Sequence, residues 1–281
     1  MKNIYYLKEL LPQKFSLDIA RHGKCTLFGN ECGLFRVYVY DCCSSSLDKA
    51  WELIREKRMN PGDSVLCFSQ TKGRGRMGRE WVSCRGNILA AWMIPYPEHA
   101  WCNNLLPLIM GLTLKRAMLN LGISLSIKWP NDLIYENKKA GGILIEEKNN
   151  QLVAGIGLNL VLPEKKRMRE SSSTVPGHLA DHFVDTNPAE VWAKLVYLAH
   201  FWYVDILCKF SLIDFIREIN SNLWLMGENI SIESGPKLIE GILTGIGEKG
   251  EILVEQSTGV VRITSGSIRS IEPHDRFNKR S

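Results

Sequence analysis

The chain has 281 residues, of which 45% are hydrophobic and 23% charged, which is typical of a folded globular protein and excludes a disordered or fibrous chain. A net charge of +5 is too small to indicate nucleic-acid binding by itself, and a polyphosphate substrate or an acidic partner suits it as well. The amino terminus lacks the apolar run of a signal peptide, and we expect no membrane-spanning stretch, so we predict a cytoplasmic protein.

Residues 1–34 predict no clear element. The elements predicted after them are, in chain order, a strand at 34–40, a helix at 47–59 capped by Ser46, strands at 64–68 and 87–92, a helix at 105–121 ended by Gly122, a strand at 124–128, a hairpin of 143–147 and 152–160, helices at 188–207 and 212–223, and strands at 229–233, 238–246, 251–255 and 260–264. The polar segment 161–187 predicts a solvated loop. Short strands separated by glycines after Gly227 indicate a small β-barrel.

The eight cysteines are scattered along the chain, and none form a Cys-x-x-Cys pair. We therefore expect neither a zinc site nor a disulfide framework. Reduced thiols are the default in a cytoplasm.

The most informative segment is residues 73–81, which read Gly-Arg-Gly-Arg-Met-Gly-Arg-Glu-Trp and are called the Gly/Arg loop below. Glycines allow backbone N–H groups to approach a ligand, and arginines offer donors that match phosphate and carboxylate oxygens. The spacing differs from the Walker A and dinucleotide-binding patterns. Arg-Gly runs also occur in disordered RNA-binding tails, but buried-strand patterns on both sides argue against a tail here. The loop is therefore predicted to enclose an anionic ligand.

Four further motifs combine polar groups with places where backbone can approach a ligand. They are 44–48 (Ser-Ser-Ser-Leu-Asp), 128–134 (Lys-Trp-Pro-Asn-Asp-Leu-Ile), 139–146 (Lys-Ala-Gly-Gly-Ile-Leu-Ile-Glu) and 155–159 (Gly-Ile-Gly-Leu-Asn). Read singly, the first is explained by a helix cap, the second by a turn and the third by a hairpin. The small residues of the fourth leave room for a flat ligand or for a packed helix.

Taken together and in this order, the motifs resemble those of the biotin protein ligases, in the form without an N-terminal DNA-binding domain. The resemblance covers about residues 36–160 strongly and 227–272 weakly. It implies an α+β fold, with a mixed sheet and helices on one side as in class II aminoacyl-tRNA synthetases, plus a C-terminal SH3-like barrel. The implied domains are an uncertain segment at 1–34, a catalytic domain at 35–225, the barrel at 226–275 and a tail at 276–281.

The resemblance implies an ATP-dependent biotin–[acetyl-CoA-carboxylase] ligase. Biotin and ATP would form biotinyl-5′-AMP, and a lysine of a biotin carboxyl carrier protein would then take the biotin. Mg²⁺ would arrive on the ATP phosphates, with no ligand residues assigned. No nucleic acid or membrane partner is expected, and a homodimer through an exposed sheet edge fits the resemblance.

The family motifs assign roles to residues at matching positions. The catalytic residues would be Lys139, Arg74, Arg76 and Asp132. Biotin would contact Ser45, Ser46, Gln70, Gly73, Arg74, Arg76, Lys139 and Gly142. ATP or the adenylate would contact Arg76, Arg79, Trp81, Lys128, Asn131, Asp132 and Asn159. Leu47 stands where many members carry Asn, and Arg269 is the candidate for a C-terminal contact to phosphates.

Two other functions stay open. One is a ligase for another acid, such as lipoate, on the same scaffold, although the Gly/Arg loop and residues 128–132 match the biotin branch. The other is a non-enzymatic, DNA-binding biotin sensor, which the roughly 35 residues before the catalytic region disfavour.

Overall fold

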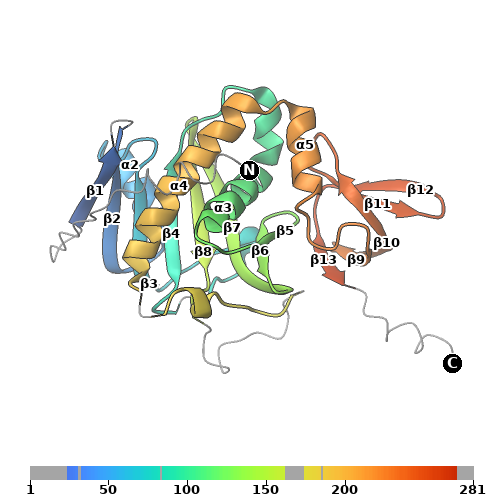
Figure 1. Cartoon of the computed structure of the whole chain (residues 1–281), viewed down its shortest axis with the longest axis horizontal. Helices are drawn as coiled ribbons and strands as arrows, with labels where there is room; N and C mark the ends of the chain where they lie inside the picture. Colours follow the sequence, from blue (N-terminus) through green and yellow to red (C-terminus); the bar gives the residue numbers. More distant parts are fainter. Residues whose placement is uncertain (1–23, 31–32, 83, 162–173, 185, 271–281) are drawn as a thin grey trace.

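The computed structural model describes residues 24–30, 33–82, 84–161, 174–184 and 186–270. A mixed sheet of eight strands forms the larger part of the molecule (Figure 1). In spatial order its strands are β1 (Lys24–Asn30), β2 (Gly33–Cys43), β3 (Ser64–Gln70), β4 (Ile88–Ile94), β8 (Gln151–Leu158), β7 (Lys138–Lys148), β6 (Asp132–Tyr135) and β5 (Ser126–Lys128). β2 and β3 pair in parallel, and the other neighbours pair antiparallel.

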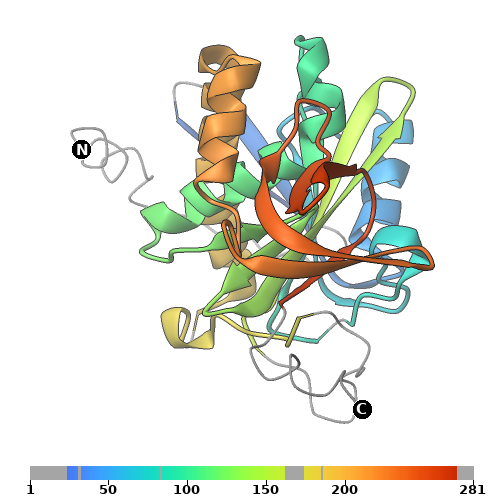
Figure 2. The same ribbon diagram turned by 90° about the vertical axis from the view of Figure 1, so that its right-hand side faces the viewer.

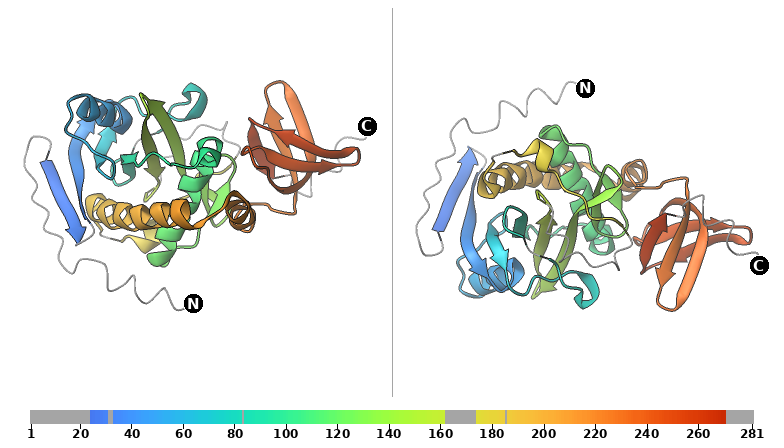
Figure 3. Two further views of the ribbon diagram at one scale, coloured as in Figure 1. Left: turned by 90° about the horizontal axis from the view of Figure 1, so that it is seen from above. Right: turned by 90° about the horizontal axis from the view of Figure 1, so that it is seen from below.

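Helices cover both faces of this sheet, which corrects the expectation of helices on one side. Along β4, Ala90 and Trp92 face the core shared with α3 (Leu106–Asn120) and α4 (Pro188–Lys209). The alternate residues Ala91 and Met93 face a second core under α2 (Ser46–Arg55). Figure 3 shows α2 and α4 on opposite sides of the strands.

The chain ends in a second, antiparallel sheet, which follows α5 (Leu212–Asn220). Its order is β12 (Gly259–Ile263), β11 (Ile252–Gln256), β10 (Lys237–Ile246), β9 (Asn229–Ser234) and β13 (Ser267–Ser270). The strands curl around a small core that includes Ile232 and Ile268 (Figure 2). The predicted fold class is therefore confirmed. The domain limits drawn from the sequence stay predictions, and residues 1–23 and 271–281 lie outside the described residues.

Several predicted elements change at their ends. The predicted helix at 47–59 begins at Ser46, with Ser45 rather than Ser46 at the N-cap, and ends at Arg55. It ends early because Lys57 takes a positive φ of 57° and the Arg58 N–H returns to the Leu53 carbonyl. Strands β1, β6 and β13 were not predicted. Each is short or lies in a sequence without clear alternation.

One helix corrects the expectation that no segment is long enough to span a membrane. By length and composition α4 meets that criterion. However, half of its most apolar window is buried, and Trp192 and Tyr203 on it are fully buried against the sheet. Its apolar character is therefore that of a core helix.

Cys43 at the end of β2 and Cys67 in β3 form a disulfide, so the expectation of reduced thiols is wrong for this pair. Cys42, Cys84, Cys102 and Cys208 are free.

Candidate active site

Two glycine-rich strands form a platform on the α2 side of the sheet. Gly142 in β7 and Gly157 in β8 are partners in register, and the ring of Trp81 lies against both. A Cβ atom at Gly157 would lie 2.4 Å from the ring, and one at Gly142 would lie 2.9 Å from it. The glycines therefore make room for the Trp81 side chain of the Gly/Arg loop. The sequence had left open whether a flat ligand or a packed helix occupies this space.

The start of α2 closes the other end of this platform. The Leu47 side chain packs on Gly155, where a Cβ would lie 2.8 Å away. Ser45 and Ser46 are buried just before it. The Ser46 N–H donates to Gln70 Oε1 over 2.6 Å, which joins the helix start to the end of β3. Buried hydroxyls and a carboxamide thus stand beside an apolar wall.

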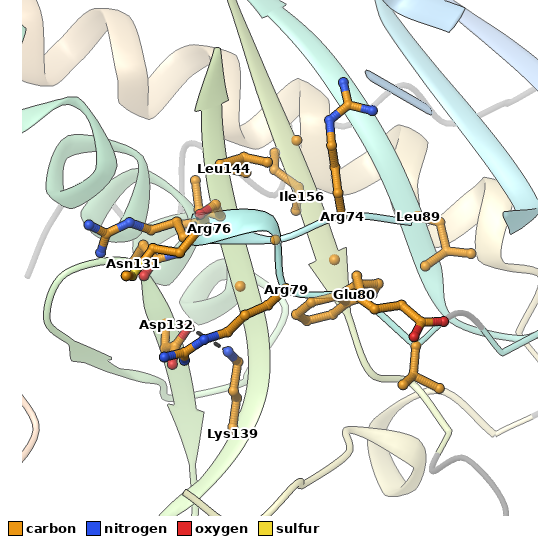
Figure 4. A pocket seen from close by; sticks show the side chains of 18 of the residues that line it. Arg74, Arg76, Arg79, Glu80, Leu89, Asn131, Asp132, Lys139, Leu144 and Ile156 are labelled. Atoms are coloured by element: carbon orange, nitrogen blue, oxygen red, sulfur yellow. Dashed lines mark hydrogen bonds and ion pairs between the residues drawn. The ribbon is translucent and has the colours of Figure 1, made fainter. Parts of the chain in front are cut away.

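Between these features lies a cavity of about 320 Å³, drawn in Figure 4. Of the predicted site residues, those that line it are Ser45, Ser46, Gln70, Arg74, Arg76, Arg79, Trp81, Lys128, Asn131, Asp132, Lys139, Gly142 and Asn159. Gly73 is not part of the lining, and its carbonyl accepts the Trp81 N–H over 3.0 Å at the base of the loop. Five separate motifs therefore meet at one cavity.

A cluster of charge lies at one end of the cavity. Lys139 Nζ is 2.6 Å from Asp132 Oδ1 and 5.5 Å from the centre of the Trp81 ring. Figure 4 shows Arg79 reaching toward the same two residues. Burial lowers the pKa of the Arg76 guanidinium, against the effect of Asp132 and together with that of Arg79. Lys139 thus pairs with Asp132, and the two arginines add positive charge to the same end of the cavity.

Lys128 is the most enclosed cation of the site, with 1% of its surface exposed. Its Nζ donates to Thr174 Oγ1 and lies 5.4 Å from the centre of the Trp224 ring. Burial, opposed by Asp132 and reinforced by the neighbouring cations, lowers the pKa of Lys128 to about 8. This amine is therefore poised to change charge near neutral pH.

The two asparagines of the site bind backbone. Asn131 Nδ2 donates to the Ile143 carbonyl over 2.6 Å, and Asn159 Nδ2 donates to the carbonyls of Lys139 and Gly177 over 3.3 and 3.0 Å. They fix the strand ends that carry Asp132 and Lys139. The tight β5–β6 turn between Lys128 and Asp132 contains a cis peptide bond before Pro130.

Arg74 is oriented differently from the other arginines and points away from Asp132 and Lys139 (Figure 4). Its Nε lies 2.9 Å from Glu146 Oε1, and its Nη1 lies 2.7 Å from Asp48 Oδ1. No role was predicted for Asp48 or Glu146, because the predictions drawn from their two motifs rested on other residues.

Two further residues of the site region, Thr174 and Ser267, were not predicted from the sequence. Thr174 lies within the polar segment 161–187, which carries no motif, and Ser267 with Gly266 brings the second sheet to the cavity wall. The candidate Arg269 is not part of the lining and forms an ion pair with Glu233 at 2.9 Å. No pattern in the sequence distinguishes Thr174 or Ser267 from ordinary loop residues.

Comparison with known proteins agrees with this geometry. Residues 39–161 match the model of the biotin/lipoate A/B protein ligase family. A biotin–[acetyl-CoA-carboxylase] ligase of Paracoccus denitrificans is 31% identical over 215 residues, which cover 69% of this chain and 85% of that protein. This chain belongs to the biotin/lipoate protein ligase family. The bifunctional ligase/repressor BirA of Escherichia coli is 28% identical over 236 residues, which cover 78% of this chain and 70% of BirA.

A solved member of the family has the same fold. The biotin protein ligase of Aquifex aeolicus, in complex with biotin and ATP, aligns with a TM-score of 0.68 and 28% identity, covering 83% of this chain and 97% of that one. The segment matched by the family model includes the Gly/Arg loop and the glycine platform. Thr174 and Ser267 lie beyond that segment.

Proposed function

We propose that this protein is a biotin protein ligase, which joins biotin to AMP and transfers it to a lysine of a biotin carboxyl carrier domain. The observation that carries the proposal is the division of the cavity. One end has an apolar wall and buried hydroxyls, which suit a small acid with a polar ring. The other end gathers Arg76, Arg79, Lys128 and Lys139, which suit phosphates.

In the first step, a carboxylate oxygen of biotin attacks the α-phosphorus of ATP. A new P–O bond forms, the bond to the β-phosphate bridge breaks, and pyrophosphate leaves with the electron pair. An anion here attacks a polyanion, so positive charge must be in place beforehand. Lys139 is suited to lie between carboxylate and α-phosphate because Asp132 holds its ammonium at the cluster.

In the second step, the amine of the carrier lysine attacks the carbonyl carbon of the mixed anhydride. A C–N bond forms, the C–O bond breaks, and AMP leaves. The amine must lose a proton, and we assign its acceptance to Asp132, a carboxylate that lines the cavity beside Lys139. Trp81 and the Gly/Arg loop cover the reacting region and limit the access of water.

Mg²⁺ would accompany the nucleotide. No group of three or more His, Cys, Asp or Glu side chains is placed to hold a metal ion in the described ranges. We propose that the ATP phosphates would hold this metal ion.

The test is acid-dependent exchange between ATP and pyrophosphate with the purified protein, with biotin, lipoate and octanoate compared side by side. We expect exchange with biotin alone, followed by labelling of a single lysine on a carrier domain. Exchange with lipoate instead would assign the protein to the lipoate branch of the family. Tight biotin binding without exchange would contradict the enzymatic proposal and favour a sensor.

A further inference from the structure

The Gly/Arg loop closes on itself at its base. Gly75 N–H donates to the Arg79 carbonyl over 2.7 Å, Trp81 N–H donates to the Gly73 carbonyl over 3.0 Å, and Arg74 and Glu80 form an isolated bridge. The tip holds Met77, which has a φ of 57° and is 84% exposed. The tip therefore has little support of its own, and its position depends on how the base is attached to the sheet.

Two side chains attach the base, and each of them contacts β7; Trp81 also lies against Gly157 of β8, and Arg74 also pairs with Asp48 of α2 over 2.7 Å. Gly142, Leu144 and Glu146 alternate along this strand and so face the same side. Trp81 lies against Gly142, and Arg74 donates to both oxygens of Glu146 over 2.9 and 3.2 Å. Leu144, between the two attachments, lines the cavity. The loop thus crosses the cavity with one fixed point at each end.

Glu146 is itself held in place. Trp51 Nε1 of α2 donates to Glu146 Oε2 over 2.7 Å, and Lys148 Nζ lies 4.0 Å from the same oxygen. The Glu146 side chain is only 20% exposed. Burial alone would raise the pKa of Glu146, but the hydrogen bonds from Arg74 and Trp51 keep it below its ordinary value. The carboxylate is therefore ionised at neutral pH.

We propose that Glu146 is a positioning residue, which holds the Gly/Arg loop over the cavity through Arg74 and so sets how long the acyl-adenylate is retained. This inference rests on the proposed function. It also gives Arg74 a different role from the one expected from the sequence, where Arg74 contacts the ligand directly.

The two roles of Arg74 predict opposite results when Glu146 loses its charge. If Arg74 is a loop anchor, Glu146→Gln weakens the attachment, because a bidentate ion pair becomes a single hydrogen bond from the guanidinium to a neutral amide oxygen. The loop then opens more often and the adenylate escapes faster. If Arg74 instead binds the ligand, the same change leaves Asp48 as the one carboxylate that competes with the ligand for its guanidinium, and retention is unchanged or improved.

The experiment compares Glu146→Gln with Glu147→Gln in the full chain. Glu147 is the next residue of β7, is exposed and hydrogen-bonds Tyr96 at 3.0 Å, so it controls for the same chemical change away from the loop. The first measurement is hydrogen exchange of amides 74–80 in the ligand-free protein. We expect exchange about tenfold faster in Glu146→Gln and unchanged in Glu147→Gln.

The second measurement is the release of adenylate formed from biotin and ATP in a single turnover. We expect release about tenfold faster in Glu146→Gln, with more labelling of non-target lysines and a smaller change in the rate of adenylate formation. Trp51→Phe removes one donor to Glu146 and should shift both measurements less in the same direction. Unchanged loop exchange, or tighter retention of the adenylate, would overturn the proposal.

The two arms separate the two claims. Loop exchange is measured without any ligand, so it tests the anchor even if biotin is not the substrate. Absence of adenylate in the wild-type protein would instead count against the proposed function.

Discussion

Two lysines of the site are placed in contrasting surroundings and should behave differently. Lys139 is 29% exposed at its side chain and lies 2.6 Å from the Asp132 carboxylate. Lys128 is almost fully buried beside Trp224, and burial disfavours its charged form. We infer that the charge of Lys128 changes with pH at about pH 8.

Titration of Lys128 should make stability rise with pH and ATP binding weaken with pH. Its pKa is about 8 in the folded protein and near 10.5 when exposed, so between these values the unfolded chain binds more protons. The free energy of unfolding therefore rises with pH from about 8 to 10.5, by on the order of 3 kcal/mol from this group. ATP binding should weaken over the same window as the ammonium is lost.

Lys128→Met isolates this contribution from other groups that titrate at high pH. We expect the variant to lose the rise in stability, measured as urea unfolding at pH 7.5 and 10, and to show a raised KM for ATP at both pH values. A wild-type rise that persists unchanged in Lys128→Met would show that other groups cause it.

Lys139 should be essential for the first chemical step. Lys139→Met removes the ammonium from the Asp132 cluster, and loss of one such group commonly costs about 100- to 1000-fold in rate. We expect that loss in kcat for ATP–pyrophosphate exchange, with biotin binding weakened less. The neighbouring Lys138 is exposed and begins β7, so Lys138→Met is the matched control and should retain the wild-type rate.

At the scale of elements, the glycines of β7 and β8 decide where the Gly/Arg loop rests. The sequence indicated that backbone is approached closely at 141–142 and 155–157. The structure shows which groups approach it, namely the Trp81 ring at Gly142 and Gly157 and the Leu47 side chain at Gly155. These contacts exclude any larger residue without rearrangement.

Adding a methyl group to the platform should displace the loop while leaving the sheet intact. At Gly157 the new Cβ would lie 2.4 Å from the Trp81 ring, and at Gly142 it would lie 2.9 Å from it. We expect both Gly→Ala variants to bind biotin and ATP more weakly, Gly157→Ala more than Gly142→Ala, measured by calorimetry. Equal or absent effects would show that Trp81 is not held by this platform.

The sequence predicted elements with strong periodicity and motifs with dense polar spacing. The helix at 105–121 and the hairpin through Asn149 and Asn150 are found nearly as predicted, since Gly122 and the two asparagines take the positive φ that ends or turns the chain. The partners of Arg74 were not predictable, because Glu146 is 72 residues away and its register on β7 decides the contact. Contacts between distant segments, such as Lys128 with Thr174, leave no local pattern.

At the scale of the whole molecule, the second sheet is docked on the segment that carries Lys128 and Asp132. Trp129 Nε1 donates over 2.9 Å to the carbonyl of Gly250, which lies in the turn between β10 and β11. The backbone of Ile127 also exchanges hydrogen bonds with Asn222 and Trp224, just before that sheet. Since Ser267 lines the cavity, the position of the second sheet shapes the phosphate end of the site.

Gly250→Ala should therefore impair ATP binding from a distance. Gly250 has a φ of 80°, and a Cβ there would lie 2.8 Å from the carbonyl oxygen of Asn104, which lies just before α3. Gly227 has the same φ of 80° but no atom within 4 Å of such a Cβ, so Gly227→Ala controls for backbone strain alone. We expect Gly250→Ala to destabilise the protein by about 1 kcal/mol more than Gly227→Ala, because of the steric conflict at this contact.

We also expect a raised KM for ATP in Gly250→Ala only. The wall that carries Ser267 should shift in this variant, while the biotin end, which is built on β3, β8 and α2, keeps its geometry. If both variants alter the KM for ATP equally, strain within the small sheet rather than its docking controls the phosphate end.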